Sequence, residues 1–189
     1  MRLRRYAPSL RAVRDQAGAA AVEFAFIAPV LCLMLAAVID LGNVLYVRFR
    51  LDSAVSAAGD YAMINAASVT STGGATLASN AATIVEASQG ASWADTTVVV
   101  NDGPTTTITS GVASASGTAS AADSCYCPTY AAGTVTWGSA TTCGASCASG
   151  ATAGKYVTIK ASHAYSPLFS SYGIVKSGAV SASATVRTQ

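Results

Sequence analysis

Residues Ala17 to Val47 read AGAAAVEFAFIAPVLCLMLAAVIDLGNVLYV, and this stretch decides the fold of the chain. Its only charged residues are Glu23 and Asp40. A segment of about twenty-one residues, beginning at Ala25 and ending at Leu45, is long enough to cross a hydrocarbon core of ~30 Å as a helix that rises ~1.5 Å per residue. The sequence therefore predicts one transmembrane helix, with a kink at Pro29 and with Asp40 at the outer interface.

Basic residues give this helix its orientation. The arginines that precede the apolar stretch are Arg2, Arg4, Arg5, Arg11 and Arg14. Only two, Arg48 and Arg50, follow closely after it. Because the cytoplasmic flank of a membrane helix carries the excess of Lys and Arg, we expect a cytoplasmic N-terminus and a single pass through the bacterial inner membrane. Everything after about Arg48 is then exported to the periplasm or the cell exterior.

The composition excludes several classes of function. The chain has 189 residues, a net charge of +2 and only 11% charged residues, whereas about 25% is typical. Such a length suits one modest domain and an anchor. Basic residues are few after Arg50 and form no phosphate-binding patch, so we expect no nucleic acid among the partners.

An ordinary secretory signal peptide is the alternative to a retained anchor, since it also begins basic and continues apolar. Two features favour the anchor. Glu23 stands early in the apolar stretch, and the stretch continues for another ten residues beyond Ala36 and Ala37 instead of ending at a small-residue cleavage site.

A processing motif lies at the cytoplasmic edge of the helix. Ala19 follows Gly18, Glu23 is the fifth residue after Gly18, and Phe24 comes directly after Glu23. This spacing resembles the precursors of type IV pilin-like proteins, which a prepilin peptidase cuts after the glycine, here between Gly18 and Ala19. The cut creates an α-amino group, with a pKa of about 7.7 to 8.0, that Glu23 of a neighbouring subunit could neutralise. The alternative is that Glu23 is only an interfacial carboxylate.

Helical periodicity continues past the membrane. Apolar residues recur at spacings of three and four along one stripe: Val44, Val47, Leu51, Val55, Ala58 and Ala62. The sequence thus predicts three parts, namely a basic leader over residues 1–18, a transmembrane and stalk helix over 19–67, and an exported domain over 68–189. The outer half of the helix is expected to pack on this domain.

The exported part is predicted to be α+β. A short helix is expected to end at Gly90, and residues 96–101 and 105–109 flank a turn signal and predict a hairpin. Two further half-buried strands are expected over residues 155–165 and 180–187. The Ser- and Ala-rich residues 110–124 are interpreted as a flexible loop. The fold class is therefore a long helix on a short helix and a mainly antiparallel sheet.

Five cysteines bear on the chemistry. Cys32 lies in the membrane helix and is interpreted as a packing residue. Four cysteines lie in the exported part, in two clusters: Cys125, Cys127, Cys143 and Cys147. We expect two disulfides joining the clusters, each worth roughly 3 kcal/mol, with the pairing left open. The alternative is an uncleaved, membrane-anchored thiol-disulfide enzyme or metal-binding protein that uses these four residues.

No other catalytic arrangement emerges. His163 is the single histidine, without a nucleophile in a recognised context, and is interpreted as a surface or packing residue. No phosphate-binding or dinucleotide-binding motif is present. Most tyrosines, including Tyr126, Tyr130, Tyr156, Tyr165 and Tyr172, are interpreted as packing residues. We therefore predict no enzyme activity, no cofactor and no metal.

Taken together, these features resemble the TadE-like pseudopilins, or minor pilins, of the tight-adherence (Flp) type IV pilus system. The similarity rests on residues 19–25 with Pro29, on LYVRFRLD at residues 45–52 and on the paired-cysteine region. It continues with YVTIKAS at 156–162, leading to SPLF at 166–169, and with SATVR at 183–187. One departure is Phe24, where major Flp pilins usually carry tyrosine, and together with the chain length this argues against the major subunit.

The resemblance implies a structural role. The chain would be processed by the system's prepilin peptidase and would support assembly of pili for surface adherence. Its partners would be the membrane, the peptidase, other pilin or pseudopilin subunits and the pilus assembly platform.

Overall fold

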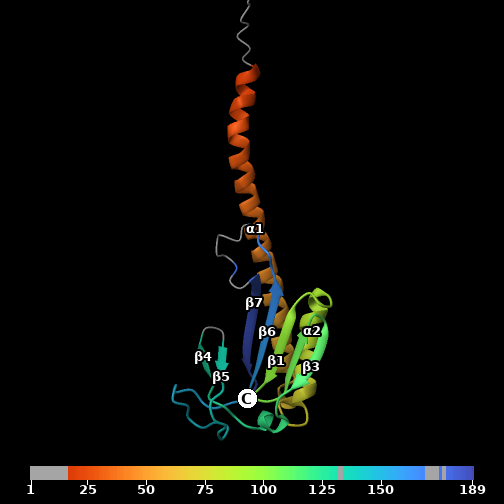
Figure 1. Cartoon of the computed structure of the whole chain (residues 1–189). Coiled ribbons are helices and arrows are strands. Elements are labelled where there is room, and N and C mark those ends of the chain that lie inside the picture. Colours follow the sequence, from red (N-terminus) through yellow and green to blue (C-terminus); the bar gives the residue numbers. More distant parts are fainter. Residues whose placement is uncertain (1–16, 132–133, 169–174, 176–177) are drawn as a thin grey trace, which may run out of the picture.

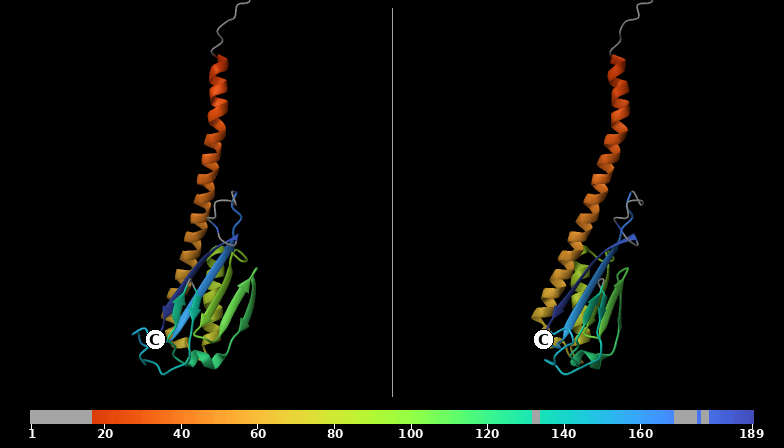
Figure 2. Two further views of the ribbon diagram at one scale, coloured as in Figure 1. Left: turned by 60° about the vertical axis from the view of Figure 1, so that its left-hand side comes forward. Right: turned by 90° about the vertical axis from the view of Figure 1, so that its left-hand side faces the viewer.

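A computed structural model describes residues 17–131, 134–168, 175 and 178–189. Most of the predicted leader lies outside the described residues, as do Phe169 and Tyr172. The first element is helix α1, Ala17–Ile64, which runs as one helix through Pro29. Its N-terminal half extends away from the domain, and its C-terminal half lies against it (Figure 1 and Figure 2). The predicted anchor and stalk thus form one continuous helix.

The C-terminal half of α1 packs through the predicted apolar stripe. Leu51, Val55, Ala58 and Ala62 are all buried. The helix ends at Ile64, slightly before the predicted end at residue 67, and the 3-10 turn Ala66–Ser68 follows it. The predicted break and second helix are confirmed.

That second helix is α2, Gly74–Gln89. Gly90 follows it with a φ of 96°, a conformation that glycine adopts without the strain a side chain would cause.

The exported domain contains a five-stranded sheet in the order β3-β2-β1-β6-β7. Every neighbouring pair is antiparallel. The strands are β1 Asp95–Val100, β2 Thr105–Thr109, β3 Val112–Ser116, β6 Tyr156–Ala164 and β7 Ala179–Arg187. The predicted hairpin is formed by β1 and β2, and the two predicted C-terminal strands are β6 and β7. The α+β fold class is confirmed.

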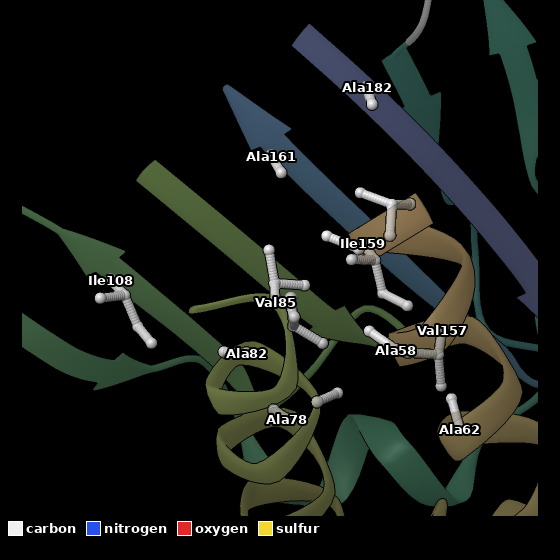
Figure 3. Packing of buried hydrophobic residues seen from close by; sticks show 14 of the residues in the cluster. Ala58, Ala62, Ala78, Ala82, Val85, Ile108, Val157, Ile159, Ala161 and Ala182 are labelled. Atoms are coloured by element: carbon white, nitrogen blue, oxygen red, sulfur yellow. The ribbon is translucent and has the colours of Figure 1, made fainter. Parts of the chain in front are cut away.

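The core lies between the two helices and one face of the sheet (Figure 3). Alanines of α1 and α2, among them Ala58 and Ala82, face strand residues such as Ile159. Small helix residues let the helices approach the sheet closely, so a domain with few large side chains still excludes water from its interior.

The interpretation of residues 110–124 as a flexible loop is wrong. β3 pairs with β2 along its full length, and the short 3-10 helix η2, Ala119–Asp123, follows it. Ser110 and Gly111 connect the two strands with φ values of 50° and 79°. Two positive φ values in a two-residue loop are typical of the hairpin turn that matches the strand twist, which explains why a low-complexity stretch forms a regular strand.

A second, two-stranded sheet was not predicted from the sequence. It consists of β4, Thr129–Ala131, and β5, Thr134–Thr136. Tyr130 and Val135 of this hairpin line a cavity together with Thr158 and Thr185 of the large sheet. The hairpin therefore lies over the sheet face opposite the helices.

Candidate functional site

The predicted processing motif lies in the first turns of α1. Gly18 is already helical, whereas the sequence placed the helix start at Ala19. A Cβ atom added at Gly18 would meet nothing within 4 Å. Glu23 and Phe24 are exposed, and 69% of the Phe24 surface is accessible. All four motif residues are thus exposed at the end of α1 that points away from the exported domain, where another protein can reach them.

The helix beyond the motif presents apolar side chains in all directions. The most exposed of them include Phe26 at 77%, Ile27 at 63%, Met34 at 63% and Val38 at 67%. In the described part of the chain α1 is the one helix long and apolar enough to cross a membrane, and its most apolar window has no buried residues. Such a surface is unfavourable in water, so this half of α1 requires a bilayer or apolar partner helices around it.

Among the described residues of α1, Asp40 is the first that is buried. The phenol of Tyr165, just after β6, donates a hydrogen bond of 2.7 Å to Oδ1 of Asp40. Asp40 is only 6% exposed. Asp40, which was predicted to lie at the membrane interface, thus has a hydrogen-bond partner that the sequence did not indicate. Nothing in the local sequence around Tyr165 signals this contact, because the two residues are far apart in the chain.

The hydrogen bond between Tyr165 and Asp40 predicts that the stability of the folded protein falls at alkaline pH. Burial, followed by the hydrogen bond and the charge of Asp40, raises the pKa of Tyr165 above its ordinary value. The folded state therefore holds this proton more tightly than the unfolded state does, so stability is intact below pH ~10 and falls as the pH rises through the folded-state pKa. Thermal unfolding of the detergent-solubilised protein between pH 8 and 11 measures this loss. The loss should be smaller in Tyr165→Phe. If the melting temperatures of the two proteins fell equally with pH, the prediction would be contradicted.

The two disulfides join the two cysteine clusters, as predicted. Cys125 bonds to Cys143 and Cys127 to Cys147, with Cα–Cα distances of 4.9 Å and 5.6 Å. The first cysteine of one cluster thus pairs with the first of the other, which settles the pairing that the sequence left open. Cys125 is fully buried and Cys143 is exposed. Since both bonds use all four sulfurs, none of the four is a thiolate in this structure.

Removing the two disulfides separately should have unequal effects. Both close loops of similar length, with sequence separations of 18 and 20, so the chain-entropy contribution is about 3 kcal/mol for each. Replacing both cysteines by alanine at Cys125 and Cys143 also removes a buried sulfur and should cost more than the same change at Cys127 and Cys147. Urea unfolding of the two double variants, followed by tryptophan fluorescence, measures the difference. Equal losses would show that burial of the Cys125 sulfur contributes nothing.

Asn101 holds the segment that leads into the first disulfide, whereas the sequence alone indicated only that it ends a strand. Its side chain is fully buried. Nδ2 donates to the carbonyl oxygens of Ala122 at 3.1 Å and Ser124 at 2.7 Å. Oδ1 accepts the backbone N–H of Tyr156 at 3.0 Å. One amide thus connects the end of β1, the start of β6 and the chain before Cys125.

The aromatic residues divide between packing and exposure. Tyr126 and Tyr156 are buried, as predicted for most tyrosines, whereas 57% of the Tyr130 surface is accessible. His163 stacks on Trp93 with ring centroids 4.3 Å apart, and its Nδ1 also contacts the Trp93 carbonyl oxygen. His163 is therefore a packing residue.

Residues 18–60 match the family model described as TadE-like protein. This segment is similar to the TadE-like family. The TadE-like segment begins at Gly18 and includes Glu23, the exposed apolar half of α1 and most of the stripe that packs on the exported domain. It stops before the disulfide region and the sheet.

No curated protein and no solved structure matches the chain. The TadE-like assignment thus rests on the helix. Together with the apolar surface of that helix and the disulfides, it describes a membrane-anchored protein with an exported domain.

Proposed function

We propose that this chain is a pseudopilin or minor pilin that a prepilin peptidase processes after Gly18 and that supports assembly of tight-adherence (Flp) pili. The observation that carries the proposal is the start of the TadE-like segment at Gly18, in a part of α1 that touches nothing else in the described chain. The basic leader places the N-terminus in the cytoplasm of a bacterial cell. The three parts are then the leader, the anchor and stalk helix, and the exported domain.

The contact at Asp40 bears on where the membrane lies. Asp40 is buried against Tyr165, and the exported domain contacts α1 again at Val44. A hydrocarbon core that ends before Asp40 reaches back by about twenty residues at ~1.5 Å each, to about Ala20. We therefore place the span several residues closer to the N-terminus than the predicted segment, which begins at Ala25.

This placement gives Glu23 a sharper role. A carboxylate inside the apolar layer is unfavourable unless a cation pairs with it. After cleavage the nearest new cation is the Ala19 amine, one helical turn away on the same face in the same subunit, or that of an adjacent subunit. The pairing between subunits would set the axial offset between them in a filament. Cleavage then prepares the subunit for assembly as well as removing the leader.

Sequencing the N-terminus of protein isolated from the membranes of its own host tests the proposal. We expect a mature N-terminus at Ala19, whereas a chain that still begins at Met1 would refute processing. The same preparation separates the alternative function, an uncleaved thiol-disulfide enzyme or metal-binding protein. That alternative requires Met1 together with a reductase, isomerase or metal-binding activity that is lost when Cys125, Cys127, Cys143 and Cys147 are replaced.

A further inference from the structure

The sheet face opposite the helices, here called the outer face, is lined by hydroxyl groups. Strand register places Ser114, Thr107, Thr97, Lys160 and Ser183 side by side across all five strands. In adjacent rows the outer face carries Thr158 beside Thr185, and Ser162 beside Ser181. Alternation along each strand directs these polar side chains away from the core. The TadE-like segment contributes no residue to this face.

Three hollows on the outer face meet at Lys160. The first, of about 420 Å³, is lined by Asp95, Thr97, Ser162 and Ser183 among others. A second, of about 450 Å³, lies between the sheet and the β4–β5 hairpin. A third, of about 110 Å³, is lined by Trp137. Lys160 lines all three, so the hollows lie next to one another and are here together called the groove; its charged groups are the Lys160 ammonium, shared by all three, and the Asp95 carboxylate in the first.

The groove contains hydrogen-bonding groups that are not used within the chain. Among the described residues, no hydrogen bond or salt bridge is made by the side chains of Thr97, Ser162, Ser183 or the ammonium group of Lys160. Asp95, by contrast, already accepts the backbone N–H of Ser110 at 3.0 Å. Each free hydroxyl can donate one hydrogen bond and accept others, and the ammonium can donate three. A ligand with many hydroxyls and a negative charge matches this set.

Aromatic side chains close one end of the groove. Tyr130 lines the hollow under the hairpin, and Trp137 lines the smallest one. Trp137 is held by an edge contact with Tyr126, at 5.9 Å between centroids, and by a tilted contact with Tyr156 at 6.4 Å. Aromatic rings of this kind combine a large apolar surface with a polar edge, so they can pack against the C–H face of a polar ring.

We infer that this groove binds an acidic oligosaccharide. The ammonium of Lys160 pairs with a sugar carboxylate, the free hydroxyls of Thr97, Ser162 and Ser183 bond to the sugar hydroxyls, and Tyr130 and Trp137 contact the sugar rings. Other occupants fit less well. One cation is too few for a nucleic-acid backbone. The large apolar side chains Val99, Val135 and Trp137 come together only in the smallest hollow, of about 110 Å³, which leaves little room for the anchors of a protein partner. The paired backbone of the inner strands cannot accept an added strand.

Calorimetric titration of the full chain in lipid nanodiscs tests the inference. The probe is a linear oligogalacturonate, and a cello-oligosaccharide of equal length serves as the neutral comparison. Binding of the acidic probe is expected, weakening with added salt, and binding of the neutral one should be weaker. Lys160→Gln should weaken binding of the acidic probe by about tenfold or more, since a charge-assisted hydrogen bond is lost.

Control variants separate the groove from the rest of the domain. Thr97→Val removes a groove hydroxyl and should weaken binding, whereas Thr136→Val removes an exposed hydroxyl that lines none of the three hollows and should not. The inference is overturned if neither sugar binds at millimolar concentration, or if Lys160→Gln and Thr97→Val bind like the wild type. It is also overturned if the chain forms a dimer that Lys160→Gln dissociates, because a second copy would then occupy the groove. The groove does not depend on processing at Gly18, so either proposal can fail without the other.

Discussion

A Gly18→Leu variant is expected to accumulate in the membrane as an uncleaved precursor and to support no pilus assembly. The physical reason lies at the scissile bond. Gly18 is in the first turn of α1, so the peptidase must open that turn to reach the bond. Glycine makes this opening easier by about 1 kcal/mol relative to alanine and presents no side chain to the peptidase. Leucine removes both advantages. Electrophoretic mobility and N-terminal sequencing in the native host measure the cleaved fraction.

The structure provides a matched control for this variant. Gly42 lies in the same helix, and a Cβ atom added there would likewise meet nothing within 4 Å. Gly42→Leu should therefore be cleaved like the wild type. Because a Cβ atom at either position meets nothing in the described chain, a defect confined to Gly18→Leu would point to recognition by the peptidase and not to folding. Normal cleavage of Gly18→Leu would refute the assignment of the site.

Loss of the Asn101 side chain is expected to destabilise the exported domain strongly. Asn101→Gly keeps the backbone freedom required by a φ of 57° but leaves two carbonyl groups and one N–H without their partners. At about 1 kcal/mol for each bond, the free energy of unfolding should fall by about 3 kcal/mol. For a domain of this size that lowers the melting temperature by roughly 10–20 °C. Thermal unfolding followed by tryptophan fluorescence measures it.

Two further variants separate the hydrogen bonds from the backbone conformation. Asn101→Ala should be worse than Asn101→Gly, since it adds the strain of a positive φ, about 1–2 kcal/mol. Ser110→Gly relieves a similar strain at an exposed position with a φ of 50° and thus reports that contribution alone, with the opposite sign. If Asn101→Gly were as stable as the wild type, the amide would not hold the segment before Cys125.

The sequence predicted those elements whose pattern lies within a short stretch of the chain. Spacings of three and four residues predicted the buried stripe of α1, and Leu51 and Val55 are indeed buried. Alternation predicted β6 and β7. The interpretation of residues 110–124 failed because it relied on composition, whereas Ser110 and Gly111 form a tight turn that brings β3 onto β2. Hydrogen bonding to a neighbouring strand can order a segment that has little preference of its own.

The functional residues likewise fall into those related by local spacing and those brought together only by the fold. Gly18, Ala19, Glu23 and Phe24 were predicted as a processing site from their spacing along a helix, and that site stays a prediction. The Asp40–Tyr165 contact and the amide of Asn101 were missed, since each joins segments far apart in the chain. The groove around Lys160 was missed for a related reason. Its residues come from several strands and a hairpin, and only strand register brings them onto one face.

The sequence by itself determined the long helix α1 with its apolar N-terminal half, the end of that helix, the α+β class and the joining of the two cysteine clusters. These features follow from local periodicity and composition, which act on neighbouring residues in the chain. Only the tertiary structure decided which cysteine bonds to which, that Tyr165 contacts Asp40, and that hydroxyls gather around Lys160. Those features depend on how helices and strands pack around one core, and that packing is set by the whole chain at once.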